Sequence, residues 1–255
     1  MRKMILGAAA GVLVLSGCSG DGNATAAEPS PTAAVAGSGC PNMAANVGGR
    51  QLRFGVGGAT NLAGIAAGTG STGIVLAHES DADVCQWVLE FNELIGKGYR
   101  VLAFDSHGFG ASGDSRANFD DDVVAAATAL RADGATKVVL MGASMGGTYS
   151  LSAATKITPP VTAVISSSGP AVYGGVDAAE AVPKIAVPVL FVAQEDDRLF
   201  GQEARQMYDL AKASPDTEIK VTPGTTHGHR LVSPGGDEAI RKVMYAFLAK
   251  HAPPA

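Results

Sequence analysis

Short apolar runs alternate with amphipathic segments along most of the chain. Six of these runs show little polar alternation, which is typical of parallel strands buried on both faces of a sheet. They cover residues 73–77, 99–104, 137–141, 161–165, 188–192 and 218–221. Segments with apolar residues at helical spacing lie between them, at residues 84–95, 120–132, 202–213 and 237–250. This alternation predicts an α/β fold with a doubly wound, mostly parallel sheet flanked by helices, and residues 51–67 are expected to add antiparallel edge strands.

A Gly-x-Ser-x-Gly sequence follows the third apolar run. Gly142 and Gly146 flank Ser144, which predicts a tight strand-to-helix turn that exposes the serine hydroxyl at the edge of the sheet. The helix that follows would direct its positive end toward this hydroxyl, and the N–H of Met145 would be the first donor of an oxyanion hole. A glycine-rich turn with a capping serine is the alternative, because 33 of the 255 residues are glycine.

Two further polar residues follow later apolar runs. Asp197 lies beyond residues 188–192, and His227 lies beyond the last run. The carboxyl ends of parallel strands meet at one edge of the sheet, so these residues are expected near Ser144. The order Ser, Asp, His along the chain is that of α/β-hydrolases.

Three more motifs extend this resemblance to the chain from about Gly48 to its end. Residues 105–112 are similar to the family's D-x-x-G-x-G-x-S turn, and residues 223–228 are similar to its P-G-x-x-H-G loop. Residues 194–200 resemble its acid turn, G-x-x-D-x-x-V, with Gln194 in place of the glycine. The chain thus resembles a small esterase of the α/β-hydrolase family, similar to dienelactone hydrolases. The connection from 169 to 187 is short, so little or no lid domain is expected.

The resemblance implies a catalytic triad. Ser144 would be the nucleophile, His227 the general base, and Asp197 the residue that fixes the imidazole tautomer and stabilises its charged form. Asp196, beside Glu195, is the alternative acid, and His229 is the alternative base.

The second oxyanion donor departs from the family pattern. Relatives carry His-Gly-x after the first central strand, whereas this chain has His78-Glu79-Ser80, so Ser80 would be the donor. A carboxylate near the developing oxyanion would oppose it, so Glu79 is expected to face outward; a weaker enzyme and an altered geometry are the alternatives.

The first residues of the chain predict a targeting segment. A basic start at Arg2 and Lys3 precedes an apolar run over residues 4–15, which is shorter than the about 20 residues that span a bilayer. The residues that end at Cys18 resemble the lipobox of bacterial lipoproteins, and an ordinary signal peptide is the alternative. Three parts are therefore predicted: a lipoprotein signal peptide (1–17), a flexible tether (18–45) and an α/β-hydrolase domain (46–255). The mature protein would be held on a membrane surface of the bacterial cell envelope by lipid on Cys18.

Charge and cysteine usage limit the partners. Beyond Cys18, Cys40 and Cys85 form an even pair in an oxidising location, which predicts a Cys40–Cys85 disulfide, with two free thiols as the alternative. Histidine and cysteine do not cluster at the spacing of metal ligands, so neither metal nor cofactor is expected. A net charge of -5 without a block of Lys or Arg argues against nucleic acid.

These features predict a serine hydrolase that cleaves carboxylic esters, with a small molecule, a surface lipid or a polyester as the substrate. Trp87, Phe109, Tyr173 and Phe200 are candidates for the lining of its cleft, and ordinary packing is the alternative for each. Peptide or amide hydrolysis, or acyl transfer, on the same residues is the second hypothesis. A binding lipoprotein that has lost activity is the third. The sequence does not indicate an oligomeric state.

Overall fold

The structure is a computed structural model that describes residues 42–59 and 61–255. Its main sheet has eight strands in the described residues, in the order β1-β2-β4-β3-β5-β6-β9-β10. The strands are β1 (Arg50–Phe54), β2 (Leu62–Ala67), β3 (Thr72–Ala77), β4 (Arg100–Asp105), β5 (Lys137–Ala143), β6 (Ala163–Ser167), β9 (Val189–Gln194) and β10 (Thr217–Thr222). From β4 to β10 every neighbouring pair is parallel, whereas β2 pairs antiparallel with both β1 and β4. The predicted doubly wound sheet and its antiparallel edge are confirmed.

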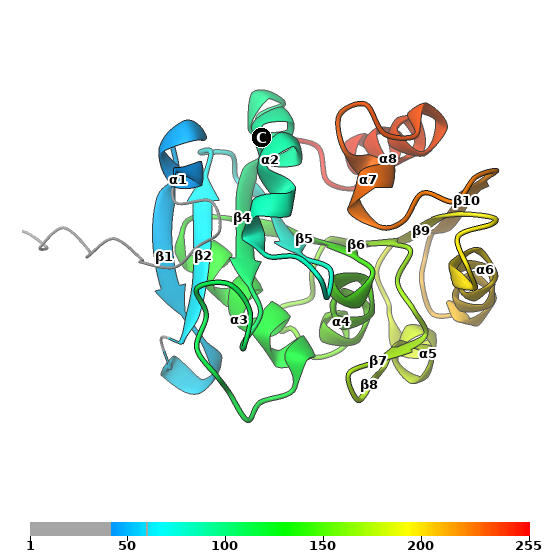
Figure 1. The fold of residues 1–255 in the computed structure, drawn as a ribbon, viewed down its shortest axis with the longest axis horizontal. Coiled ribbons are helices and arrows are strands. Elements are labelled where there is room, and N and C mark those ends of the chain that lie inside the picture. The colour runs from blue at the N-terminus through cyan, green and yellow to red at the C-terminus, as the bar shows by residue number, and fades with distance from the viewer. Residues whose placement is uncertain (1–41, 60) are drawn as a thin grey trace, which may run out of the picture. The chain divides into compact units, whose positions relative to one another are not determined.

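Helices cover both faces of this sheet (Figure 1). One face carries α3 (Phe119–Ala132), α4 (Met145–Ala154), α5 (Ala178–Ala181) and α6 (Phe200–Leu210). The other carries α1 (Met43–Asn46), α2 (Val88–Gly96), α7 (His229–Val232) and α8 (Glu238–His251). Short 3-10 helices lie at Val56–Gly58, Val84–Trp87 and Val182–Lys184.

Alternate residues of the central strands face the two helical layers. In β3, Val75 packs on the side of α3 and α4, and Ile74 and Leu76 pack on the side of α2 and α8. All three are fully buried. A strand covered on both faces needs apolar side chains at every position, which is why these runs lack polar alternation.

Two of the predicted helices differ most clearly from their observed form. The predicted helix over 84–95 is a 3-10 turn capped by Asp83, which accepts the N–H of Cys85 at 2.8 Å, followed by α2. The helix predicted to end at residue 213 ends at Leu210. Pro215 lies shortly beyond this end, and helical geometry is disfavoured at the residue that precedes a proline.

A small hairpin stands where larger relatives would insert a lid. Between β6 and β9 the chain forms β7 (Val172–Tyr173), β8 (Val176–Asp177) and the single turn of α5. The expected absence of a lid domain is confirmed for the described residues.

Much of the predicted targeting segment lies outside the described residues. The signal peptide at 1–17, Cys18, most of the tether and Cys40 are in this part, so lipidation and the Cys40–Cys85 disulfide stay predictions. Met43 and Ala44 of α1 are buried in the core, three and two residues before the expected start of the domain at 46. In the described part of the chain, no helix has the length and apolar character needed to cross a membrane.

Candidate active site

Ser144 occupies the sharp turn between β5 and α4. Its backbone has φ 48° and ψ -119°, a conformation that residues with a side chain rarely adopt. The turn is held because Ser144 donates its N–H to the Ser167 carbonyl at 2.8 Å, while its own carbonyl accepts the N–H groups of Gly147 and Thr148. Strained backbone of this kind is characteristic of functional positions, where the surrounding structure fixes it.

The two glycines beside Ser144 are required by close backbone contacts. A Cβ on Gly142 would lie 2.1 Å from the carbonyl oxygen of Gly146. A Cβ on Gly146 would lie 2.2 Å from the carbonyl oxygen of Ala77. Both neighbours are backbone atoms, so they cannot move aside without deforming β3 or the elbow. The Gly-x-Ser-x-Gly pattern is therefore a packing requirement of this turn.

Replacing Gly146 by alanine should lower stability and displace Ser144. We expect a loss of about 1–3 kcal/mol in the free energy of unfolding, the range for overpacking a dense core. Urea unfolding of wild type and Gly146→Ala measures it. Gly96→Ala is a matched control, because a Cβ there meets nothing within 4 Å. An equally stable Gly146→Ala variant would contradict the packing argument.

Asp197 and His227 are joined by a direct contact. Asp197 Oδ2 lies 2.7 Å from Nδ1 of His227, and the Asp197 side chain is 6% exposed. The His227 side chain is 33% exposed, and its ring packs 4.4 Å from that of Phe200. Because the carboxylate binds Nδ1, it can hold the imidazole tautomer that leaves Nε2 free to accept a proton.

Ser144 and His227 line the same cavity. Its volume is about 530 Å³, and it is also lined by Ser80, Asp81, Tyr173, Asp196, Asp197, Arg198, Phe200 and Thr225. Within residues 42–59 and 61–255 no hydrogen bond joins Ser144 to His227. Catalytic hydrogen bonds of this kind commonly tighten when substrate binds.

The alternative acid and base have other positions. Asp196 lines the cavity, whereas the carboxylate that contacts His227 is that of Asp197. Glu195 forms an ion pair with Arg205. His229 turns toward Glu79, with its Nδ1 at 3.2 Å from Oε2.

The two residues expected to donate to an oxyanion both lie near Ser144. Met145 is the first residue of α4, and in the described chain its N–H makes no hydrogen bond. Ser80 lines the cavity with Ser144. The turn that carries Ser80 is tied to α4, because Gly146 donates its N–H to the His78 carbonyl at 3.1 Å.

His78 joins this turn to the end of β4. Its Nε2 accepts the N–H of Ser106 at 3.0 Å, so the proton lies on Nδ1, which donates to the Glu79 carbonyl at 2.6 Å. Burial lowers the pKa of His78, with nearby carboxylates acting in the opposite direction, which favours this neutral form. His78 therefore fixes the turn that carries Ser80 to the end of β4.

The expectation that Glu79 faces outward is wrong. Glu79 is 8% exposed, and its Oε1 accepts the N–H of His229 at 2.6 Å. Burial acts to raise the pKa of Glu79, but hydrogen bonds and the charge of His229 outweigh it and lower that pKa. Its carboxylate is thus held against the loop that carries His227.

Two of the four aromatic candidates line the cavity. Tyr173 and Phe200 do so. Trp87 is fully buried in the core, 6.1 Å from the ring of His229, and Phe109 packs against His78 with ring centroids 5.0 Å apart. For these two, the alternative of ordinary packing holds.

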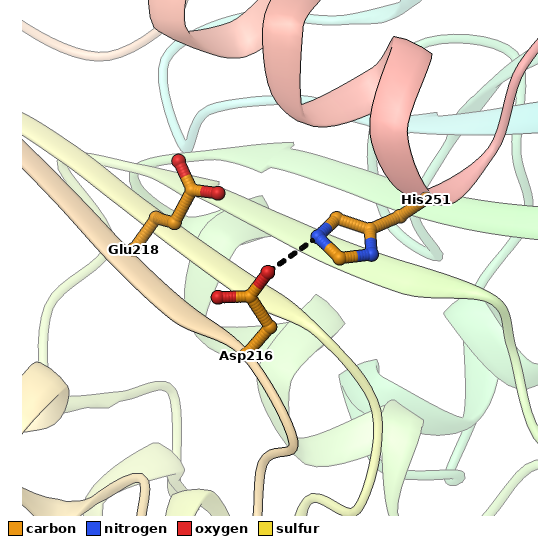
Figure 2. Close-up of side chains that lie close together, drawn as sticks. All are labelled: Asp216, Glu218 and His251. Atoms are coloured by element: carbon orange, nitrogen blue, oxygen red, sulfur yellow. Dashed lines mark ion pairs between the residues drawn. The ribbon is translucent and has the colours of Figure 1, made fainter.

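A carboxylate and imidazole cluster lies away from the cavity, between β10 and α8. Asp216, Glu218 and His251 converge there, with Asp216 Oδ2 at 2.9 Å from Nε2 of His251 (Figure 2). Nζ of Lys250 is 2.5 Å from Asp216 and 3.3 Å from Glu218. Lys250 already forms ion pairs with both carboxylates, so the cluster is an ion-pair network between α8 and the β10 edge of the sheet.

Comparison with known proteins finds a family model that matches part of the chain and solved structures that share its fold. Residues 74–180, less than half of the chain, match the family model described as serine aminopeptidase, S33, and Ser144 lies within them. None of the curated proteins compared with the sequence matches it.

Solved structures share the fold at low identity. An esterase from Pyrococcus furiosus, Pf2001, superposes with a TM-score of 0.70 at 15% identity, over 81% of this chain and 92% of its own. A monoacylglycerol lipase from Paleococcus ferrophilus has a TM-score of 0.61 at 18% identity, over 74% and 98%. An enol-lactonase from Burkholderia xenovorans LB400 has a TM-score of 0.58 at 17% identity, over 74% and 96%. The expected α/β-hydrolase fold is confirmed, and the family match supports the serine hydrolase class.

Proposed function

We propose that this α/β-hydrolase cleaves carboxylic esters through an acyl-enzyme on Ser144. The observation that carries the proposal is the Asp197–His227 contact of 2.7 Å beside a cavity that Ser144 also lines. A serine hydroxyl is a weak nucleophile by itself, and a base oriented by a carboxylate is what activates it.

The reaction would proceed in two steps. In the first, Ser144 Oγ attacks the carbonyl carbon of the ester and passes its proton to Nε2 of His227. The tetrahedral adduct then expels the alcohol, which takes that proton, and leaves the acyl group on Ser144. In the second, water attacks the acyl-enzyme with His227 again as the base, and the carboxylic acid departs.

The positions of Met145 and Ser80 support stabilisation of the tetrahedral adduct. Their backbone N–H groups would bind the oxyanion, and the positive end of α4 adds to this field. Each donor of this kind is worth about 2.7–4 kcal/mol in the barrier.

Two aromatic side chains of an otherwise polar cavity lining would contact the acyl group of an ester. Tyr173 and Phe200 supply apolar walls. Two exposed apolar side chains flank these walls in sequence, Val172 at 57% and Leu199 at 65%. Without a lid domain to cover the cavity, a bulky or extended ester can reach Ser144. The substrate class proposed is therefore an ester of a small molecule, a lipid or a polyester.

Covalent labelling by a fluorophosphonate probe tests this proposal. The wild-type domain should be labelled on Ser144, and labelling should be lost in Ser144→Ala and greatly slowed in His227→Ala. Esters of graded chain length and matching amides then define the reaction. Faster turnover of amides would favour peptide hydrolysis, and a folded wild type that does not label would favour a binding protein.

We also propose that lipid on Cys18 holds the protein on a membrane surface outside the cytoplasm, and that Cys40 pairs with Cys85. The support is the apolar run that ends at Cys18 and the even number of remaining cysteines. Incorporation of labelled palmitate into wild type but not into Cys18→Ala tests the anchor. Peptide mapping without reductant tests the disulfide.

A further inference from the structure

The loop that carries His227 is held largely by side chains. Thr226 donates its N–H to Oε1 of Gln194 at 2.7 Å, and His229 donates its N–H to Oε1 of Glu79 at 2.6 Å. Between them, Gly228 donates its N–H to Ser168 Oγ at 3.2 Å and accepts from Ser167 Oγ at 2.8 Å. The peptide groups on both sides of His227 are therefore fixed from three strands of the sheet.

Two of these side chains stand where the chain departs from the family motifs. Glu79 and Gln194 both replace a glycine. Both are buried, at 8% and 7% exposure, and both reach the backbone of the same loop. Long polar side chains at these positions thus supply contacts that glycine could not make.

Glu79 holds the loop with one hydrogen bond and one ion-pair contact. One carboxylate oxygen accepts the His229 N–H, and the other lies 3.2 Å from Nδ1 of the same residue. A Cβ on Gly228 would lie 1.6 Å from Oε1 of Glu79, so the carboxylate packs directly against the peptide that follows His227. A shift of Glu79 or of this loop therefore has to move the other.

We infer that Glu79 is a positioning residue, which with the partly buried His229 forms an ion pair that sets the place of the His227 imidazole relative to Ser144. The inference rests on the proposed function, because it concerns the base of that reaction. The exchange of a proton between Ser144 and His227 requires hydrogen-bond distance, and a displacement of about 1 Å can cost about 10²-fold in rate.

The charges around the pair favour its ionised form near neutral pH. Burial acts to lower the pKa of His229, but the Glu79 carboxylate outweighs it and raises that pKa. Glu90 acts in the same direction as Glu79, and Arg230 opposes them. His227 is the further titratable group that faces Glu79. Because the pKa of His229 is raised, its contribution to the stability of the folded protein is complete below pH 6.5 and is lost as the pH rises through the folded pKa. Because the pKa of Glu79 is lowered, its contribution to stability is complete above pH 4.5 and is lost as the pH falls through the folded pKa.

Kinetics of Glu79→Gln, Glu79→Ala and His229→Asn test the inference. We expect kcat to fall about tenfold in Glu79→Gln and about 10²-fold in Glu79→Ala, with KM nearly unchanged, because the base is misplaced while the cavity remains. His229→Asn keeps a donor for Glu79 but cannot titrate. We expect kcat of the wild type to fall as the pH rises through the raised pKa of His229, and we expect this fall to be absent in His229→Asn.

A second buried pair of the same design is the matched control. Asp122 accepts both the N–H of His107 at 2.9 Å and its Nδ1 at 2.7 Å, outside the loop of His227. Asp122→Asn should cost stability but leave the pH profile of kcat unchanged. In the double variant Glu79→Ala/His229→Ala, the loss should be close to that of the worse single variant, since the two residues act as one unit.

The outcomes separate the two proposals. A wild type that fails to label with a fluorophosphonate overturns the esterase proposal. A wild type that labels, with folded Glu79 variants of equal kcat and an unchanged pH profile, overturns the positioning role and leaves the esterase proposal intact.

Discussion

Replacement of Ser144 by alanine should lower kcat for ester hydrolysis by about 10⁴- to 10⁶-fold. Without the hydroxyl there is no acyl-enzyme, and the remaining rate comes from substrate binding and the oxyanion donors acting on water. Initial rates on a chromogenic ester, with protein concentration set by active-site titration of the wild type, measure the effect. Adding His227→Ala to this variant should cost little more, because nucleophile and base act as a unit.

Ser150→Ala provides a matched control for this result. Ser150 lies on α4, the helix that follows Ser144, is fully buried, and its hydroxyl has no hydrogen-bond partner in the described residues. Its loss should leave kcat within about twofold, as expected for a site that makes no contact with the reacting atoms. If both serine variants kept wild-type rates, the nucleophile would not be Ser144 and the elbow would be only a packing feature.

The sheet was predictable because its chemistry is local in the sequence. Runs such as residues 73–77 and 138–141 are apolar at every position, which is typical of short strands covered on both faces. The turn at Ser144 was also predictable, because the backbone atoms that leave no room for a Cβ on Gly142 or Gly146 belong to residues nearby in sequence or to the adjacent β3. Polar residues at the end of a strand are harder to recognise from the sequence. The predicted run therefore stops at residue 165, whereas β6 extends through Ser166 and Ser167.

The support of the His227 loop could not be predicted, because its contacts join distant parts of the chain. The bond from His229 to Glu79 spans 150 positions, and that from Thr226 to Gln194 spans 32. From the sequence, Glu79 and Gln194 were visible only as departures from glycine in the family motifs. Their burial depends on how β3, β9 and the loop meet in space, which no periodic pattern records.

Replacement of Asp197 by asparagine should lower kcat by about 10⁴-fold while the fold is retained. The amide is close in shape to the carboxylate, but it carries no charge to stabilise the imidazolium that forms as Ser144 attacks. It can also present its N–H₂ group to Nδ1 of His227, which favours the tautomer with the proton on Nε2. That proton would then face Ser144, and His227 could no longer accept one.

The neighbouring Asp196 allows a test of which aspartate is the acid of the triad. Asp196 lines the same cavity, whereas Asp197 is the residue that contacts His227 at 2.7 Å. Asp196→Asn removes the same charge one position away, and it should change kcat by less than about tenfold because it leaves the tautomer of His227 untouched. A pH profile of kcat for each variant completes the comparison. If Asp196→Asn caused the larger loss, the acid of the triad would be Asp196, and the buried contact of Asp197 would serve to anchor the acid turn instead.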